Sequence, residues 1–261
     1  MYTPERMASN PSAAHNRQRA AGTMLVELMV ALALASIAIA AAIAALMVAR
    51  DAAAAIHEMT LLQQQASYAL RSMGRQIRSA GSLELQAIAD GPSAVRFALP
   101  TVSGTSRVHG TDGGPGASDS LTLAHVAPPL LPGLQRDCLG QTAAPGTRTL
   151  ATFQVDANGN LICRSSSGRS QPLIAGVAAF KLRFRVDKGA QLQSMSASEV
   201  EAAQQWPAVR AVEVCLELRG EQRVTASEHE YIGCFKRSAR SAGRMTLVTR
   251  RLFLLNALLE D

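Results

Sequence analysis

The sequence predicts an α+β protein in which a long N-terminal helix packs on an antiparallel β-sheet. Three observations predict this fold class. Residues 28–49 form an uncharged apolar run, no proline occurs between Pro11 and Pro92, and short alternating apolar runs replace helical periodicity after Gly81. Apolar residues make up 48% of the 261 residues, which is enough to bury a core.

The net charge and the number of cysteines limit the functions that the chain can have. Lys and Arg number 26 and Asp and Glu number 20, so the formal charge is +6. This mild excess excludes an acidic tail protein and gives little support to a nucleic-acid interface. Four cysteines are too few for a disulfide scaffold, but they permit two bridges in an oxidising compartment.

The uncharged run predicts a single membrane-spanning helix. As a helix, its 22 residues from Leu28 to Ala49 span about 33 Å, against a hydrocarbon core of about 30 Å. The run is longer than the apolar region of an ordinary secretory signal. Arg17 and Arg19 precede it, and basic residues on that flank favour a cytoplasmic N-terminus. We therefore expect an inner-membrane protein whose remaining chain lies in the periplasm.

The helix is expected to continue beyond the membrane and to become amphipathic. A stripe with three- and four-residue spacing predicts the buried face, and it comprises Met59, Leu62, Ala66, Ala69, Met73, Ile77 and Ala80. Polar and basic residues lie off that stripe, among them Arg71, Arg75 and Arg78. Gly81 is the expected stop. Residues 31–55 include 14 alanines, and such small residues allow close helix–helix contact.

Short alternating runs after residue 82 predict the strands. The predicted strands are Val95–Leu99, Ser120–Val126, Thr152–Asp156, Leu161–Cys163, two runs within Pro172–Val186, a run within Pro207–Leu218, and a last strand within Met245–Leu259. Asn158-Gly159 is a strong hairpin signal. The segments Thr101–Ser120 and Pro128–Thr147 are expected to be loops, and Ser194–Gln205 a polar helix or loop.

The four cysteines leave three connectivities open. We prefer the sequential pairing, because Cys138 and Cys163 flank the hairpin and Cys215 and Cys234 flank a polar turn. A zinc site is the alternative, and the wide spacing of the cysteines disfavours it.

Glu27 is an anomaly, because it places a carboxylate near the start of an apolar helix without a basic residue four positions away. A charge inside the membrane is costly and is usually functional. Its surroundings, Ala21-Gly22-Thr23-Met24-Leu25-Val26-Glu27, resemble the type IV prepilin signature. The resemblance implies cleavage between Gly22 and Thr23 by a prepilin peptidase and N-methylation of Thr23, although the family usually has Phe or Met at that position. Glu27 then either pairs with the N-terminal ammonium of a neighbouring subunit or snorkels to the headgroups.

Looser motifs further along the chain resemble PilW-type minor pilins. They are Gln65–Arg71 with Ile77–Gly81, Ser118–Leu123, Trp206–Val212 and Arg251–Asn256. The resemblance implies a pilin-like fold with four parts: a leader at 1–22, a membrane and filament-core helix at 23–50, an amphipathic helix at 51–81, and a β-rich periplasmic domain at 82–261.

The function that this resemblance implies is a minor pilin in a complex that primes pilus assembly or caps the pilus tip. The implied partners are other minor and major pilins, the prepilin peptidase and N-methyltransferase, and the inner-membrane assembly platform. A minor pseudopilin of a type II secretion system is one alternative, and an adhesin or ligand-binding module on a pilin anchor is another.

No enzyme, metal or cofactor pattern emerges from the residues. The five histidines, His15, His57, His109, His125 and His229, are not paired at metal-ligand spacing. Asp156, Asn158 and Asn160 imitate the start of a calcium loop, but Ser167 stands where the bidentate Glu is needed. We therefore expect no enzymatic activity, no cofactor and no nucleic-acid partner.

Overall fold

The computed structural model describes residues 23–82, 84–87, 95–98, 101–102, 106–126, 136–144, 146–189, 191–223, 230–241 and 243–256. The chain divides into two compact units, one ending at Ala53 and the other beginning at Ala54. Helix α1 (Thr23–Ser79) has 57 residues and contributes to both units. The α+β class predicted from the sequence is confirmed.

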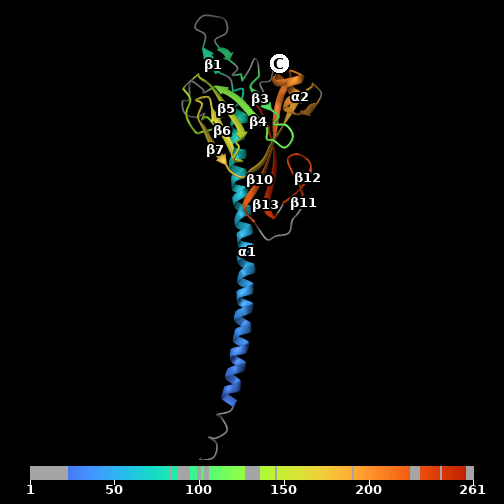
Figure 1. Ribbon diagram of the computed structural model, residues 1–261. Helices are drawn as coiled ribbons and strands as arrows, with labels where there is room; N and C mark the ends of the chain where they lie inside the picture. The colour runs from blue at the N-terminus through green and yellow to red at the C-terminus, as the bar shows by residue number, and fades with distance from the viewer. Residues whose placement is uncertain are drawn as a thin grey trace, which may run out of the picture. The chain divides into compact units, whose positions relative to one another are not determined.

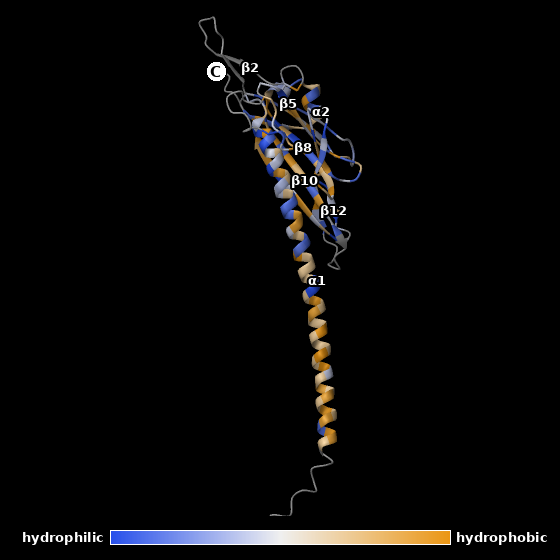
Figure 2. Ribbon diagram, turned by 90° about the vertical axis from the view of Figure 1, so that its left-hand side faces the viewer, coloured by the Kyte–Doolittle hydropathy of each residue, from blue (hydrophilic) through white to orange (hydrophobic). Residues whose placement is uncertain are grey.

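In the first unit the helix is apolar and uncovered. Figure 2 shows the first half of α1 coloured as hydrophobic almost throughout. From Met24 to Ala54 every side chain is exposed. Within the described residues, one helix is long and apolar enough to cross a membrane, and it is this one. The polar residue inside the uncharged run is Ser36, whose hydroxyl donates to the Ala33 carbonyl at 2.8 Å and so satisfies its hydrogen-bonding capacity within the helix.

The second unit holds two larger antiparallel sheets, both beside the second half of α1 (Figure 1). The five-stranded sheet has the order β3-β4-β5-β6-β7, with β3 Val108–Thr111, β4 Ser120–Val126, β5 Arg148–Val155, β6 Leu161–Ser165 and β7 Ser170–Ile174. The four-stranded sheet has the order β13-β10-β8-β9, with β8 Val177–Asp187, β9 Leu192–Met195, β10 Val209–Arg223 and β13 Arg244–Leu254.

Smaller elements complete the unit. Two hairpins pair β1 (Glu84–Ala87) with β2 (Val95–Ala98) and β11 (Glu230–Ile232) with β12 (Ser238–Arg240). A short helix α2 (Ala197–Ala202) and a 3₁₀ turn η1 (Trp206–Ala208) connect β9 to β10. Ser196 and Glu199 form a reciprocal capping box at the start of α2, which explains why a helix forms in this polar segment.

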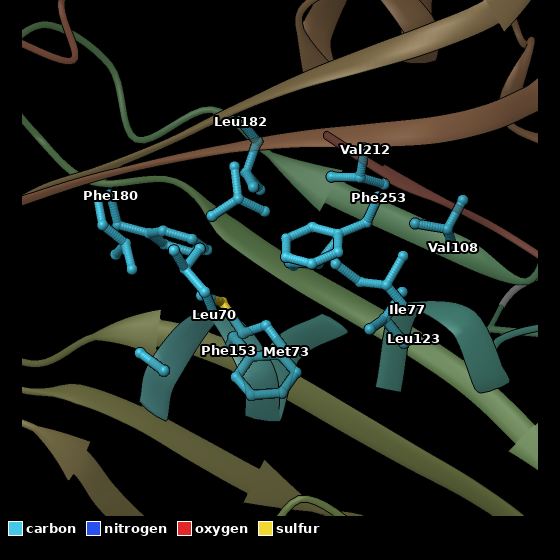
Figure 3. Close-up of a cluster of buried hydrophobic side chains, with 14 of the residues drawn as sticks. Leu70, Met73, Ile77, Val108, Leu123, Phe153, Phe180, Leu182, Val212 and Phe253 are labelled. Carbon is cyan, nitrogen blue, oxygen red and sulfur yellow. The ribbon is translucent and has the colours of Figure 1, made fainter. Parts of the chain in front are cut away.

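One face of α1 joins the two sheets in a common core. The buried apolar residues of α1 are Leu62, Ala66, Ala69, Leu70, Met73 and Ile77, and Ala80 directly after the helix is buried as well. The predicted stripe is therefore confirmed, with Leu70 added and Met59 only partly buried. Figure 3 shows Leu70, Met73 and Ile77 among side chains of both sheets, which include Leu123, Phe153, Phe180, Leu182, Val212 and Phe253. Burying each such side chain contributes about 1.5–3 kcal/mol.

Two glycines define how α1 fits. Gly81 has φ +79°, and its N–H donates to the Ala124 carbonyl at 3.1 Å, so the chain turns away here, two residues after α1 ends, and the predicted stop is confirmed. Gly74 allows close approach of β13. A Cβ atom at position 74 would lie 2.5 Å from Phe253 Cε1, so the ring would have to move.

Asp119 links the two sheets at the start of β4. Its carboxylate accepts from the Lys181 ammonium at 2.6 Å and from the Leu182 N–H at 2.8 Å, both on β8. It also accepts from the Gly113 N–H at 3.0 Å. Asp119 is only 3% exposed, and these three donors satisfy its buried charge.

Most predicted strands are confirmed, and one expectation is wrong. Ser120–Val126 is a strand with the predicted bounds, and Asn158-Gly159 connects β5 to β6. Residues 101–120 were expected to be a loop, but they contain β3, whose Val108 is fully buried opposite Leu123. A strand of four residues is too short to show clear alternation in a segment rich in Gly, Ser and Thr. The end of the last predicted strand, residues 257–259, lies outside the described residues.

The cysteines pair sequentially in the structure. Cys138 joins Cys163 of β6 with a Cα–Cα distance of 6.2 Å, and Cys215 of β10 joins Cys234 at 5.7 Å. Both distances lie in the range that a disulfide allows. The first bridge fastens the loop after residue 136 to the core, and the second fastens the turn after β11 to the four-stranded sheet.

Replacement of Gly74 tests the close approach of the helix. Gly74→Ala should destabilise the protein by about 1 kcal/mol, because displacing the Phe253 ring outweighs the better helix propensity of Ala. Thermal unfolding of the full chain in detergent measures the change. In a Phe253→Leu background the same substitution should become neutral or stabilising. Equal destabilisation in both backgrounds would contradict the contact.

Peptide mapping tests the disulfide pairing. Non-reducing digestion followed by mass spectrometry should recover Cys138 linked to Cys163 and Cys215 linked to Cys234. Replacing Cys138 and Cys163 together by Ala should lower the free energy of unfolding by about 2–5 kcal/mol. Recovery of a Cys163–Cys215 peptide, or of two free thiols, would overturn the pairing.

Candidate functional site

The candidate site begins at the N-terminal end of α1. Gly22 lies outside the described residues, and Thr23 is the first residue of the helix. Glu27 follows one turn later with an exposed side chain, and no ion pair involves it in the described part of the chain. A carboxylate in this position is therefore available to a group outside the chain.

The helix around Glu27 presents a continuous apolar surface. Met24 is 74% exposed, Met29 69% and Val48 70%. Large exposed apolar surfaces mark sites that contact another protein or a membrane. The alanines between these residues keep the helix narrow, so another helix can approach its backbone closely. In chemical terms, this part of α1 offers apolar contact and one negative charge.

The histidines do not form a catalytic or metal-binding group in the described part of the chain. His57 is exposed on α1, whereas His109 contacts the Trp206 ring at a centroid distance of 4.7 Å and the Glu201 carboxylate at 3.4 Å. His125 is 1% exposed, and burial lowers its pKa although the charge of Asp137 opposes this. Among the described residues, no cluster of three or more His, Cys, Asp or Glu could hold a metal ion.

The sequence resembling a calcium loop is a hairpin turn. The Asp156 carboxylate accepts from the N–H groups of Asn158 at 2.9 Å and Asn160 at 2.8 Å, and from the Asn160 side-chain amide at 3.0 Å. The backbone N–H of Asn160, followed by its amide, lowers the pKa of Asp156. These oxygens therefore stabilise the turn between β5 and β6.

Two basic stripes of the chain, one on β8 and one on α1, differ in the structure. On β8, Lys181 pairs with Asp119, Arg183 with Glu199 and Arg185 with Glu213. On α1, the side chains of Arg71, Arg75 and Arg78 are exposed, and no salt bridge involves them within the described residues. The β8 stripe is thus neutralised, whereas the α1 stripe carries uncompensated positive charge.

Sequence reasoning missed the roles of two buried aspartates. Asp119 lies in the Ser118–Leu123 motif, but its bonds to β8 connect residues more than 60 positions apart. Asp137 precedes Cys138, and its carboxylate accepts from the N–H groups of Leu139 and Gln141 and from the Ser165 hydroxyl. An Asp next to a loop cysteine was the available signal for the second role, because Asp side chains often organise turns.

A match to a protein family supports the resemblance seen in the motifs. Residues 141–256 match the family described as Type IV Pilus-assembly protein W. This range contains the Trp206–Val212 and Arg251–Asn256 motifs, whereas the signature around Gly22 and Glu27 lies outside it. No protein with a curated description matches this sequence.

Among solved structures, the chain is similar to a type IV-like pilin from Thermus thermophilus. The TM-score is 0.45 and the sequence identity is 14%, over 74% of this chain and 95% of that one. The family match covers residues 141–256, and over this part of the chain it confirms the PilW-like resemblance drawn from the sequence motifs.

Proposed function

We propose that this chain is a minor pilin that joins other minor pilins in a complex that primes pilus assembly or caps the pilus tip. The observation that carries the proposal is the first half of α1, which is apolar, rich in alanine and exposed from Met24 to Ala54. A simple membrane anchor needs apolar length alone. A filament subunit also needs a surface on which other helices can pack.

The division of the chain supports this role. The helix is uncovered as far as Ala54, and its second half is buried against the sheets from Leu62 onward. In our proposal residues 1–22 are a leader that is removed, residues 23–50 form the membrane and filament-core helix, and residues 51–81 and 82–261 form the periplasmic part. The N-terminus then lies in the cytoplasm until processing, and the folded domain waits in the periplasm for assembly.

Glu27 has a specific role in this scheme. Cleavage after Gly22 makes it the fifth residue of the mature chain and leaves a methylated ammonium on Thr23. In a bundle of apolar helices that ammonium needs a nearby negative charge, because an unpaired charge in a low-dielectric interior is costly. Glu27 of a neighbouring subunit supplies this charge and sets the axial register between the subunits.

The partners of this scheme are other minor and major pilins, the prepilin peptidase and N-methyltransferase, and an inner-membrane assembly platform. We propose no catalytic activity for the chain itself. The adhesin alternative would need several exposed aromatic side chains around one ligand groove. Trp206 is only 6% exposed and packs edge-on against Phe184. Among the described residues the exposed aromatic side chains are Tyr68 and Phe235, and they line separate cavities.

Affinity purification of the tagged full chain from cells of its own species tests the proposal. Recovery of pilin subunits and of the pilus assembly platform is the expected result. Recovery of type II secretion components instead would reassign the chain as a minor pseudopilin, since both systems share the N-terminal signature. Recovery of neither set would contradict the proposed function.

Replacement of Gly22 tests processing. Gly22→Val should leave the precursor at full length, because the added side chain keeps the peptidase from closing over the bond between Gly22 and Thr23. Immunoblotting measures the size of the chain. N-terminal sequencing of the protein without the substitution should find Thr23 as the first residue. The neighbouring Ala21→Val serves as a bulk control and should still be cleaved. A mature protein that starts after an alanine of the apolar run would contradict the assignment.

Replacement of Glu27 tests the charge pair. Glu27→Ala should give a processed, folded, membrane-resident protein that fails to support pili, because it leaves the ammonium of a neighbour unpaired at a cost of about 3–5 kcal/mol. Pilus number and the amount of this subunit in sheared filaments are the measurements. Asp51→Ala removes the other exposed carboxylate of this half of the helix and should have little effect. Normal pili with Glu27→Ala would show that the carboxylate only snorkels.

A further inference from the structure

A polar cavity of about 510 Å³ lies between α1, the loop of Cys138 and strand β7. All of its lining belongs to the second unit. Three arginines line it: Arg75 and Arg78 from α1, and Arg136 from the loop. Their side chains are exposed, so a ligand can reach them from solvent. The bridge between Cys138 and Cys163 holds the loop in place, which gives this cavity a fixed wall.

The arginines in the cavity carry uncompensated positive charge. Arg136 Nη1 donates to the Gly140 carbonyl at 2.8 Å, and none of the three arginines has a carboxylate partner within the described residues. The single acidic residue in the lining is Asp137, and its two oxygens already accept from Leu139, Gln141 and Ser165. The cavity therefore offers guanidinium donors to an anion, and guanidinium groups match the geometry of carboxylates.

Gln76 adds a second and different polar group. Its side chain is 5% exposed and lines the same cavity. Nε2 donates to the Arg136 carbonyl at 2.9 Å, which fixes the orientation of the amide. Oε1 is buried and accepts no hydrogen bond from the described residues. A buried acceptor without a partner is unfavourable, so a ligand that brings an N–H or O–H donor would be stabilised here.

Strand β7 limits how a ligand can bind. It is the last strand of its sheet, and Gln171, Pro172 and Leu173 line the cavity. Pro172 has no N–H to donate, and proline on an edge strand discourages the addition of another strand. Recognition at this cavity therefore depends on side chains rather than on a continued β-ladder.

We propose that the cavity binds an acidic segment of another polypeptide. Carboxylates of that segment pair with Arg75, Arg78 and Arg136, and one of its backbone N–H groups donates to Gln76 Oε1. A peptide carries a backbone N–H donor next to each acidic side chain, whereas the charged phosphodiester groups of a nucleic acid offer acceptors alone and its donors lie on the bases and sugars. The proposal concerns the second unit by itself, so it does not depend on the assembly role of the first half of α1.

Fluorescence anisotropy with the full chain in detergent micelles tests this site. The probes are a fluorescein-labelled peptide of alternating Glu and Ala, the same peptide with Gln in place of Glu, and a single-stranded oligonucleotide. The Glu peptide should bind at least about tenfold more tightly than the Gln peptide, because hydrogen bonds to charged groups are the stronger ones. Its affinity should fall as salt is added, since salt screens exposed charges.

Single arginine variants locate the binding. Arg75→Gln and Arg136→Gln should each lower the affinity for the Glu peptide by about tenfold. Arg71→Gln is the matched control, because Arg71 lies on the same helix but lines a different depression, beside β13. Arg71→Gln should change the affinity for the Glu peptide by less than about twofold, because an exposed charge outside the cavity contributes little. Thermal unfolding of each variant checks that the fold is kept.

Three results would overturn the proposal. Equal binding of the Glu and Gln peptides would show that charge is not recognised. An equal loss with Arg71→Gln and Arg75→Gln would show that the helix acts as a diffuse basic surface. Tighter binding of the oligonucleotide, with the same dependence on Arg75 and Arg136, would show that the ligand is a different polyanion.

Discussion

The whole structure depends on which apolar side chains of α1 are buried against the rest of the chain and which are not. From Leu62 to Ala80 one face of the helix is buried, and the inner faces of both larger sheets pack against it. Without that face Phe153 of one sheet and Phe180 of the other would lose much of the core that they share. From Met24 to Ala54 the same helix has no such cover, and its apolar side chains stay exposed. One continuous helix thus combines a part that completes a domain with a part that requires an external environment.

Asp119 and the two disulfides stabilise the arrangement around that helix. Asp119 connects β4 to β8 through a buried charge pair and a backbone bond, so the two sheets are joined by more than apolar contact. The Cys138–Cys163 bridge fastens a long loop to β6, and the loop then forms one wall of the arginine cavity. In this way a bond that stabilises the fold also positions the groups that line this cavity.

Much of the fold follows from local sequence patterns. The spacing of Leu62, Ala66, Met73 and Ile77 predicts the buried face of α1, and Asn158-Gly159 predicts the β5–β6 turn. The interactions that escaped prediction are long-range or weakly patterned. Strand β3 has four residues in a Gly-rich segment, and the bonds of Asp119 depend on which strands become neighbours. The Gly22–Glu27 signature predicts the candidate site, but the partner groups that we propose for it belong to other chains.

The sequence also does not show which basic residues are paired with carboxylates in the fold. Lys181, Arg183 and Arg185 on β8 and the arginines of α1 look alike in the sequence as basic stripes. In the structure the β8 residues meet carboxylates from distant segments, whereas Arg75 and Arg78 face a cavity beside Gln76. Burial of Gln76 and Ser72, which lie off the apolar stripe, reflects the loop and strand that cover this side of the helix.

Photo-crosslinking from the exposed half of α1 tests the central claim most directly. A photoreactive amino acid at Ala40, in a strain that is assembling pili, reports what this surface touches in sheared filaments. Our account predicts covalent adducts with other pilin subunits, formed through their own apolar helices. Adducts with lipid alone, or the absence of this chain from the sheared filaments, would contradict the claim that the exposed helix is an assembly surface.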